Sequence, residues 1–193
     1  QTSASISEAR IKHDIEQFRY LASLRSEGNE GFAALANQYA ALESEIDWPS
    51  ESHIPVVLTK DQRQRIRSSF SIPLNLAPAD RVSGSTLNEN LNISEISASY
   101  TGTSPNQVVI DDFLTPLALS KLQRFLLEST IWFHFKDNGY IGAQFDDGLG
   151  CPLLLQIAED LRQAFSEIFK DHKLTRLWAY KYDSQLTGIN VHA

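Results

Sequence analysis

The residue types best suited to chemistry lie near the end of the sequence, in two runs that alternate in polarity. Trp178, Tyr180 and Tyr182 occupy every second position of the first run, and Asn190 and His192 do so in the second. Successive side chains of a strand point to opposite faces, so each set shares one face. If both strands join one sheet, that face offers aromatic rings, polar tips and an imidazole, which can bind a metal or carry a proton. The pattern alone also describes a core aromatic patch with a hydrogen-bonded histidine, and it favours this structural interpretation over a site.

The other histidines have structural explanations. His13 and Gln17 lie four residues apart and share a helical face, where a solvated surface is expected rather than a ligand pair. His134 stands between two phenylalanines of an expected strand, and a structural role is predicted. His172 follows an expected helix, whose negative C-terminal end accounts for a histidine there.

Acidic pairs and the single cysteine also point to ordinary structure. Residues 146–148, Asp-Asp-Gly, are typical of a turn and lack the later ligands of a calcium loop. Asp111 and Asp112 are expected to be exposed acids in a loop. Cys151 precedes a helix-starting proline, where a thiolate would be favoured. No His/Asp arrangement accompanies it, so no catalytic role is predicted.

Three regions must position these residues. Residues 1–48 have apolar residues spaced by three and four in two successive runs, which predicts a helical hairpin with its apolar faces together. Residues 49–104 are expected to form an extended connector, containing a short helix capped by Thr59. After Pro73 this connector is rich in Ser, Asn, Thr and Gly, and it could be a functional loop, a strap on the next domain or disordered.

Residues 105–193 mix both kinds of element. The sequence predicts a strand at 108–110, a helix at 116–128, strands at 131–135 and 140–145 around a turn at 137–139, a helix at 152–170, and strands at 174–182 and 188–193. This order predicts an α+β fold in which helices pack on one side of a largely antiparallel sheet.

Composition narrows the class of protein. The 193 residues carry a formal net charge of −7, which disfavours attraction to nucleic acid or anionic membranes. No apolar run is long enough to span a bilayer, and no signal segment opens the sequence. A single cysteine excludes a disulfide within the chain, and a reducing, cytoplasmic location is expected.

Two motifs resemble a known family. The stretch VVIDDFLTP at 108–116 is similar to the entry strand and helix of prolyl-4-hydroxylase-like iron(II)/2-oxoglutarate oxygenases. The stretch YDSQLTGINVHA at 182–193 is similar to the run that reaches their first iron-binding histidine. The stretch RIKHDIEQFRYL at 10–21 resembles a helical region that precedes the oxygenase domain in some bacterial members. The resemblance covers about residues 105–193 well and the N-terminal region loosely.

The resemblance implies a fold, cofactors and roles for residues. Residues 105–193 would form the N-terminal, incomplete part of a double-stranded β-helix (jelly-roll, cupin-like) domain. His192 would open the His-x-Asp iron motif, whose Asp would follow Ala193. Tyr182 would face 2-oxoglutarate, with Asn190, Tyr180 and Trp178 on the substrate side. The cofactors would be iron(II) and 2-oxoglutarate, with ascorbate as a further candidate.

The activity implied is hydroxylation of a small molecule or a protein side chain, with release of succinate and CO2. The sequence does not contain the Asp, the second histidine or the arginine of the family's site, so the chain alone is expected to be inactive. The alternative is a non-catalytic binding or scaffold protein with a metal-free β domain. The sequence predicts no oligomeric state.

Overall fold

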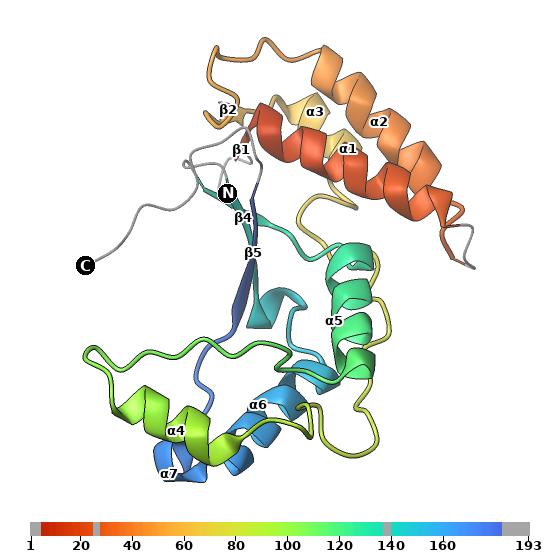
Figure 1. Cartoon of the computed structure of the whole chain (residues 1–193). Helices are drawn as coiled ribbons and strands as arrows, with labels where there is room; N and C mark the ends of the chain where they lie inside the picture. Colours follow the sequence, from red (N-terminus) through yellow and green to blue (C-terminus); the bar gives the residue numbers. More distant parts are fainter. Residues whose placement is uncertain (1–4, 25–27, 137–139, 183–193) are drawn as a thin grey trace.

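The computed structural model of the chain describes residues 5–24, 28–136 and 140–182 (Figure 1). These residues form an α+β fold with small antiparallel sheets. The helices are α1 (Glu8–Ser23), α2 (Phe32–Ser44), α3 (Lys60–Ile66), α4 (Ile93–Thr101), α5 (Pro116–Glu128), α6 (Pro152–Ala164) and α7 (Ser166–Phe169). The strands are β1 (Ser5–Ile6), β2 (Val56–Val57), β3 (His134–Lys136), β4 (Tyr140–Gln144) and β5 (Trp178–Tyr182), and a 3-10 turn, η1, spans Phe145–Asp147.

The predicted helical hairpin is confirmed. The Ser7 side chain caps α1 by accepting a hydrogen bond from the backbone N–H of Arg10. Phe18 lies at the centre of the hairpin, with its ring edge-on to Tyr39 (centroids 5.1 Å apart) and stacked on Phe32 (5.8 Å). The core of the hairpin is completed by other buried apolar residues, among them Ile6, Ile11, Ile15, Leu21, Ala36, Leu42, Leu58 and Ile66.

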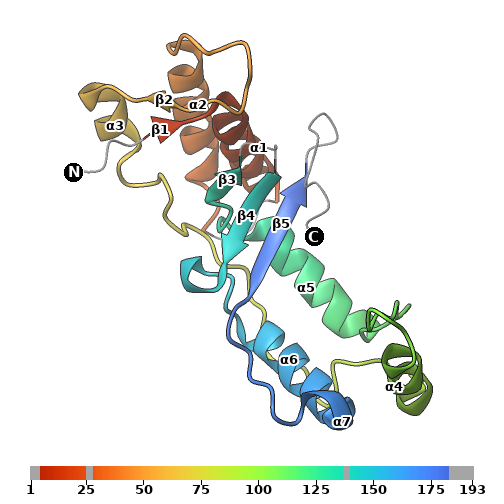
Figure 2. The same ribbon diagram turned by 90° about the vertical axis from the view of Figure 1, so that its left-hand side faces the viewer.

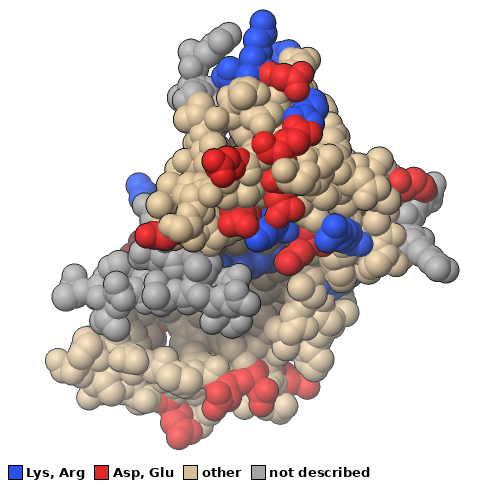
Figure 3. Space-filling model, turned by 90° about the horizontal axis from the view of Figure 1, so that it is seen from above, with Lys and Arg blue, Asp and Glu red and all other residues tan. Residues whose placement is uncertain are grey.

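The outer surface of the hairpin carries both signs of charge. Figure 3 shows acidic and basic side chains interspersed over it. Some of them are paired: Lys12 Nζ lies 2.5 Å from Glu8, and Arg65 is paired with Glu45. Such a surface has no extended field of a single sign on this face.

The larger sheet has the order β3-β4-β5, and both pairs of strands are antiparallel. Helices α5 and α6 lie on one side of it (Figure 2). Ile141 and Ala143 of β4 are buried in the apolar cluster on the helix side, together with Phe125 of α5 and Leu153 of α6. The side chains of β5 alternate between exposed and half-buried positions because successive residues face opposite sides of the sheet.

The connector is largely ordered by packing. Thr59 caps α3 with a complete capping box, which confirms the predicted short helix. Downstream, residues 73–92 run extended along the sheet domain, and Ala77, Ala79 and Val82 are buried in its core. The side-chain amide of Gln156 accepts a hydrogen bond from the Val82 N–H and donates one to the Val82 carbonyl. Helix α4 in this region was not predicted.

The predicted strand at 108–110 is wrong. Within the described part of the chain these residues have no partner strand, and Val109 is 82% exposed. A β-branched run becomes a strand only where neighbouring backbone groups complete its hydrogen bonds. The nearest β-type backbone pairing of this region lies a few residues later, as an isolated antiparallel bridge between Leu87 and Leu114.

Other boundaries also differ from expectation. The helix predicted at 152–170 is broken at Phe165, which leaves helical geometry (ψ 45°) and buries its ring. The strand expected at 131–135 begins only at His134, because Ile131 and Trp132 turn into the core. The predicted turn at 137–139 and the predicted strand at 188–193 lie outside the described residues.

The position of Phe18 predicts its effect on stability. We expect Phe18→Ala to lower the free energy of unfolding by about 3–5 kcal/mol, because it empties the centre of the hairpin core. Urea unfolding followed by circular dichroism measures this change. The matched control is Tyr20→Ala at an exposed position of the same helix, which should cost about 0.5 kcal/mol or less. A loss below about 1 kcal/mol for Phe18→Ala would contradict the packing described.

Candidate functional site

The aromatic residues of β5 lie on the more exposed face of the sheet. Trp178, Tyr180 and Tyr182 are 55%, 39% and 54% exposed, whereas the residues between them are half-buried. Tyr140 of β4 joins them, with its ring 5.0 Å from Tyr180 and 5.7 Å from Tyr182 between centroids. The face therefore carries an aromatic row, in which Tyr140 contacts both Tyr180 and Tyr182 and Trp178 lies farther along β5. Figure 2 looks toward this side of the sheet.

A glycine lets the row of rings continue across the sheet. Gly142 lies opposite both Tyr180 and His134 in the strand register. A Cβ at Gly142 would lie 3.1 Å from Tyr180 Cε1, so any side chain there would displace the ring. Beyond it, His134 Nε2 lies 2.5 Å from Asp147 Oδ2. His134 is therefore held by a carboxylate, in agreement with the structural role predicted for it.

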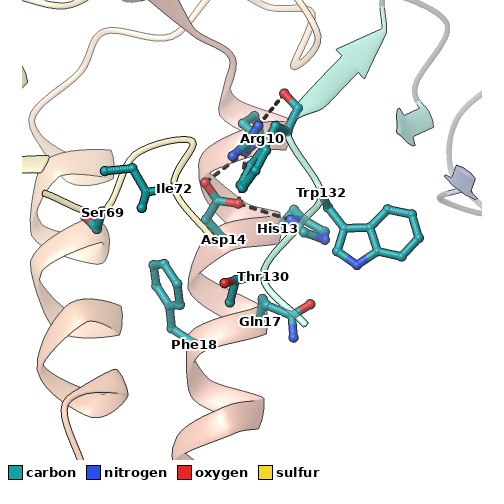
Figure 4. Close-up of a pocket in the computed structure, with 10 residues that line it drawn as sticks. Arg10, His13, Asp14, Gln17, Phe18, Ser69, Ile72, Thr130 and Trp132 are labelled. Atoms are coloured by element: carbon teal, nitrogen blue, oxygen red, sulfur yellow. Dashed lines mark hydrogen bonds and ion pairs between the residues drawn. The ribbon is translucent and has the colours of Figure 1, made fainter. Parts of the chain in front are cut away.

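A buried charged cluster lies between α1 and the segment that leads into β3 (Figure 4). Arg10 Nε donates to both carboxylate oxygens of Asp14, at 3.0 and 2.9 Å. Its Nη1 donates to the backbone carbonyl of Phe133 at 2.6 Å. The Arg10 side chain is only 6% exposed, and it needs these partners because an unpaired buried charge is costly.

Lys181 extends this cluster to β5. It lies on the opposite side of the strand from the aromatic row, and its Nζ donates to Gln17 Oε1 at 3.1 Å. The ammonium also lies over the Trp132 ring, 4.4 Å from the centroid. Desolvation lowers the pKa of Lys181 to about 8, against the opposing attraction of Asp14. Gln17 in turn donates to the carbonyl of Leu127, so α1 is tied to β5 and to the end of α5.

His13 borders the same cluster. Its Nδ1 lies 3.2 Å from Asp14 Oδ1, and its buried Nε2 has no hydrogen-bond partner. Burial lowers the pKa of His13, and this outweighs the raising effect of Asp14. The adjacent cavity measures only about 10 Å³, close to the space of one water molecule, so it cannot hold a substrate. The cluster is therefore a polar joint between elements.

Several expectations about single residues are now decided. The helical face of His13 and Gln17 is not a solvated surface, because it packs against the sheet domain, and Gln17 is 8% exposed. Cys151 is buried, and desolvation raises the pKa of its thiol, which opposes the thiolate expected at that helix start. Asp111 and Asp112 are exposed in a loop, as predicted.

Two further expectations fit the structure. Asp146 and Asp147 lie in the 3-10 turn η1, and Gly148, which ends it, adopts the left-handed conformation (φ 106°). His172 lies just after α7, with its ring edge-on to Phe169.

Three residues of the polar joint were not predicted: Arg10, Asp14 and Lys181. A signal for the first two exists in the sequence, since Arg10, Asp14 and Gln17 are spaced by four and three and therefore share a helical stripe. Nothing in the sequence connects this stripe with Lys181, which lies 164 positions from Gln17.

The remaining members of the predicted site, Asn190 and His192, lie outside the described residues. Among residues 5–24, 28–136 and 140–182, no group of three or more His, Cys, Asp or Glu side chains could hold a metal ion. In the same residues, no helix combines the length and apolar character needed to cross a membrane.

Comparison with known proteins does not identify the chain. No family model matches its sequence, no curated protein is similar to it, and no solved structure resembles it.

The lowered pKa of Lys181 predicts a pH-dependent stability. Because the folded-state pKa of about 8 lies below the ordinary lysine value, protonation favours the unfolded chain. The Lys181 contribution should therefore raise the free energy of unfolding as the pH increases from about 8 to about 10.5. We expect Lys181→Met to stabilise the protein at pH 7 by about 1–3 kcal/mol, and this gain to shrink toward pH 10.5.

Denaturant unfolding at several pH values measures this effect. The matched control is Lys136→Met on β3, where the lysine is exposed and the change should be small at every pH. If Lys181→Met instead lowers the free energy of unfolding by the same amount at every pH, the Lys181 ammonium is not desolvated in the folded protein.

Proposed function

We propose that the chain carries the first part of an iron(II)/2-oxoglutarate oxygenase domain, preceded by a helical hairpin that braces it. The observation that supports this most is the position of Tyr182. It begins the YDSQLTGINVHA motif and lies on the open face of an antiparallel sheet whose other face packs against helices. A double-stranded β-helix needs such a sheet, with a free inner face for the site and a covered outer face.

The proposed roles follow from the chemistry of the side chains. The exposed phenol of Tyr182 is a hydrogen-bond donor that can bind a carboxylate of 2-oxoglutarate. Tyr180 and Trp178, farther along the same face, would contact the substrate, together with Asn190. His192 would be one ligand of the iron. Iron(II), when bound, supplies the oxygen activation that is coupled to decarboxylation of 2-oxoglutarate.

One of the residues assigned to the cosubstrate end of such a site, Tyr182, lies among the described residues. Tyr182 is 54% exposed, so its side chain lies where a ligand could reach the hydroxyl. The substrate would be a small molecule or a protein side chain. Lys181, on the reverse side of the strand, would fix the backbone between the two tyrosines through Gln17.

The second candidate is a non-catalytic binding protein, in which the row of exposed rings is a contact surface and the β domain holds no metal. The row itself supports this alternative, because exposed aromatic residues are typical of binding surfaces. The two candidates differ in one requirement: only the oxygenase needs His192.

The test of the oxygenase proposal is His192→Ala in the natural full-length protein. We expect iron binding and 2-oxoglutarate-dependent succinate formation to be lost with the thermal stability unchanged, because a ligand contributes to metal affinity more than to the core. Iron content and succinate are measured together. His172→Ala, at an exposed histidine after α7, is the control and should keep both. Unchanged iron stoichiometry in His192→Ala would favour the metal-free alternative.

A second variant tests the role of Tyr182. Tyr182→Phe should raise the KM for 2-oxoglutarate about tenfold or more and leave the iron content unchanged, because it removes one hydrogen bond to a charged carboxylate. Tyr20→Phe, at an exposed position of α1, is the control. A Tyr182→Phe enzyme with the wild-type KM would remove Tyr182 from the cosubstrate site.

A further inference from the structure

A surface hollow lies at the end of the aromatic row remote from Tyr182. Its volume is about 440 Å³, and it is formed by η1, the segment preceding β5, and the first residues of β5. Pockets for small ligands measure roughly 300–1,000 Å³, so this hollow has the size for a small molecule. It is separate from the buried polar joint behind the sheet, which shares none of its lining residues.

The walls of the hollow are held in place by close packing. Phe145 N–H donates to the carbonyl of Leu177 at 3.1 Å, which joins its two sides. A Cβ at Gly150 would lie 2.9 Å from the Phe145 ring, and one at Gly142 would lie 3.1 Å from the Tyr180 ring. Two glycines therefore allow two rings to lie directly on the backbone. The aromatic walls are thus formed before any ligand binds, which reduces the entropy lost on binding.

Two opposite charges line the hollow without neutralising each other. Asp146 and Arg176 both contribute to it, and both are exposed. Neither has an ion-pair partner within 4.0 Å among the described residues. The neighbouring Asp147 differs, since His134 engages its carboxylate. One carboxylate and one guanidinium are therefore available to a ligand.

The combination of charges and rings selects a class of ligand. A carboxylate binds an ammonium group, and a guanidinium binds a carboxylate in a forked geometry. Exposed rings at Phe145, Trp178 and Tyr180 favour a ligand that carries an apolar or aromatic group beside its charges. A polyphosphate would require several cations and would be repelled by Asp146. Peptides carry their ammonium and carboxylate at opposite ends, whereas a free amino acid carries both on one carbon.

We propose that this hollow binds a free α-amino acid with an aromatic or large apolar side chain. Asp146 accepts hydrogen bonds from the α-ammonium group, Arg176 donates to the α-carboxylate, and Trp178 stacks on the side chain. The hollow shares Trp178 and Tyr180 with the proposed substrate side of the oxygenase, but binding in it requires neither iron nor 2-oxoglutarate. Binding measured without both can therefore fail or succeed separately from oxygenase activity.

Isothermal titration calorimetry tests the proposal on the metal-free chain without 2-oxoglutarate. The probe is L-phenylalanine, and the comparison compounds are 2-phenylethylamine and 3-phenylpropionate, each of which keeps the ring and one charge. We expect saturable binding of L-phenylalanine, with each comparison compound weaker by about tenfold or more because one charged contact is lost. No saturation by L-phenylalanine up to about 10 mM, or equal binding of a one-charge compound, would overturn the proposal.

Variants locate the binding. Asp146→Asn and Arg176→Gln should each weaken L-phenylalanine binding about tenfold or more, and Trp178→Ala should also weaken it. These side chains are exposed, so the fold should be retained, and thermal melts verify this. The charge-matched controls are Asp171→Asn and Arg162→Gln, which lie outside the hollow and should bind as the wild type does. Wild-type affinity in both hollow variants would place the ligand elsewhere and overturn the assignment.

Discussion

The polar joint of Arg10, Asp14 and Lys181 connects α1 with the sheet, and the rest of the structure depends on it. The molecule has two apolar cores, one within the helical hairpin and one between the sheet and α5 and α6. Arg10 and Asp14 lie between them almost fully buried, so each must be paired. Their pairing, and the bond from Arg10 to the Phe133 carbonyl, fix the hairpin against the segment that enters β3.

The same joint determines how β5 is presented. Lys181 is held on the hairpin side by Gln17 and Trp132, so the alternation of the strand turns Tyr180 and Tyr182 to the open side. The cost of desolvating this lysine appears as its lowered pKa. A helical region distant in sequence therefore supports the strand that carries the proposed cosubstrate residue, and the hairpin acts as a structural part of the site domain.

Much of the fold could be predicted because its signals are local. Thr59 and Thr115 each accept a hydrogen bond from a backbone N–H in the first turn of the helix that follows, and the apolar spacing identified α1, α2 and α5. The alternation of β5 placed its three aromatic residues on one face. The prediction of a strand at 108–110 was wrong because a strand requires a neighbouring strand to pair with, and the β propensity of its own residues does not provide one. The continuous helix at 152–170 was wrong because burial of Phe165 outweighs the periodic pattern around it.

By itself, the sequence determined the helical hairpin, the capped helix starts, the α+β class and the shared face of Trp178, Tyr180 and Tyr182, because each follows from residues close together in the chain. Only the tertiary structure decided that the α1 face of Gln17 is buried and that it meets Lys181. It also decided that Asp146 and Arg176 line one hollow. The physical reason is that desolvation and charge pairing depend on neighbours in space, and these come from segments that no local pattern connects.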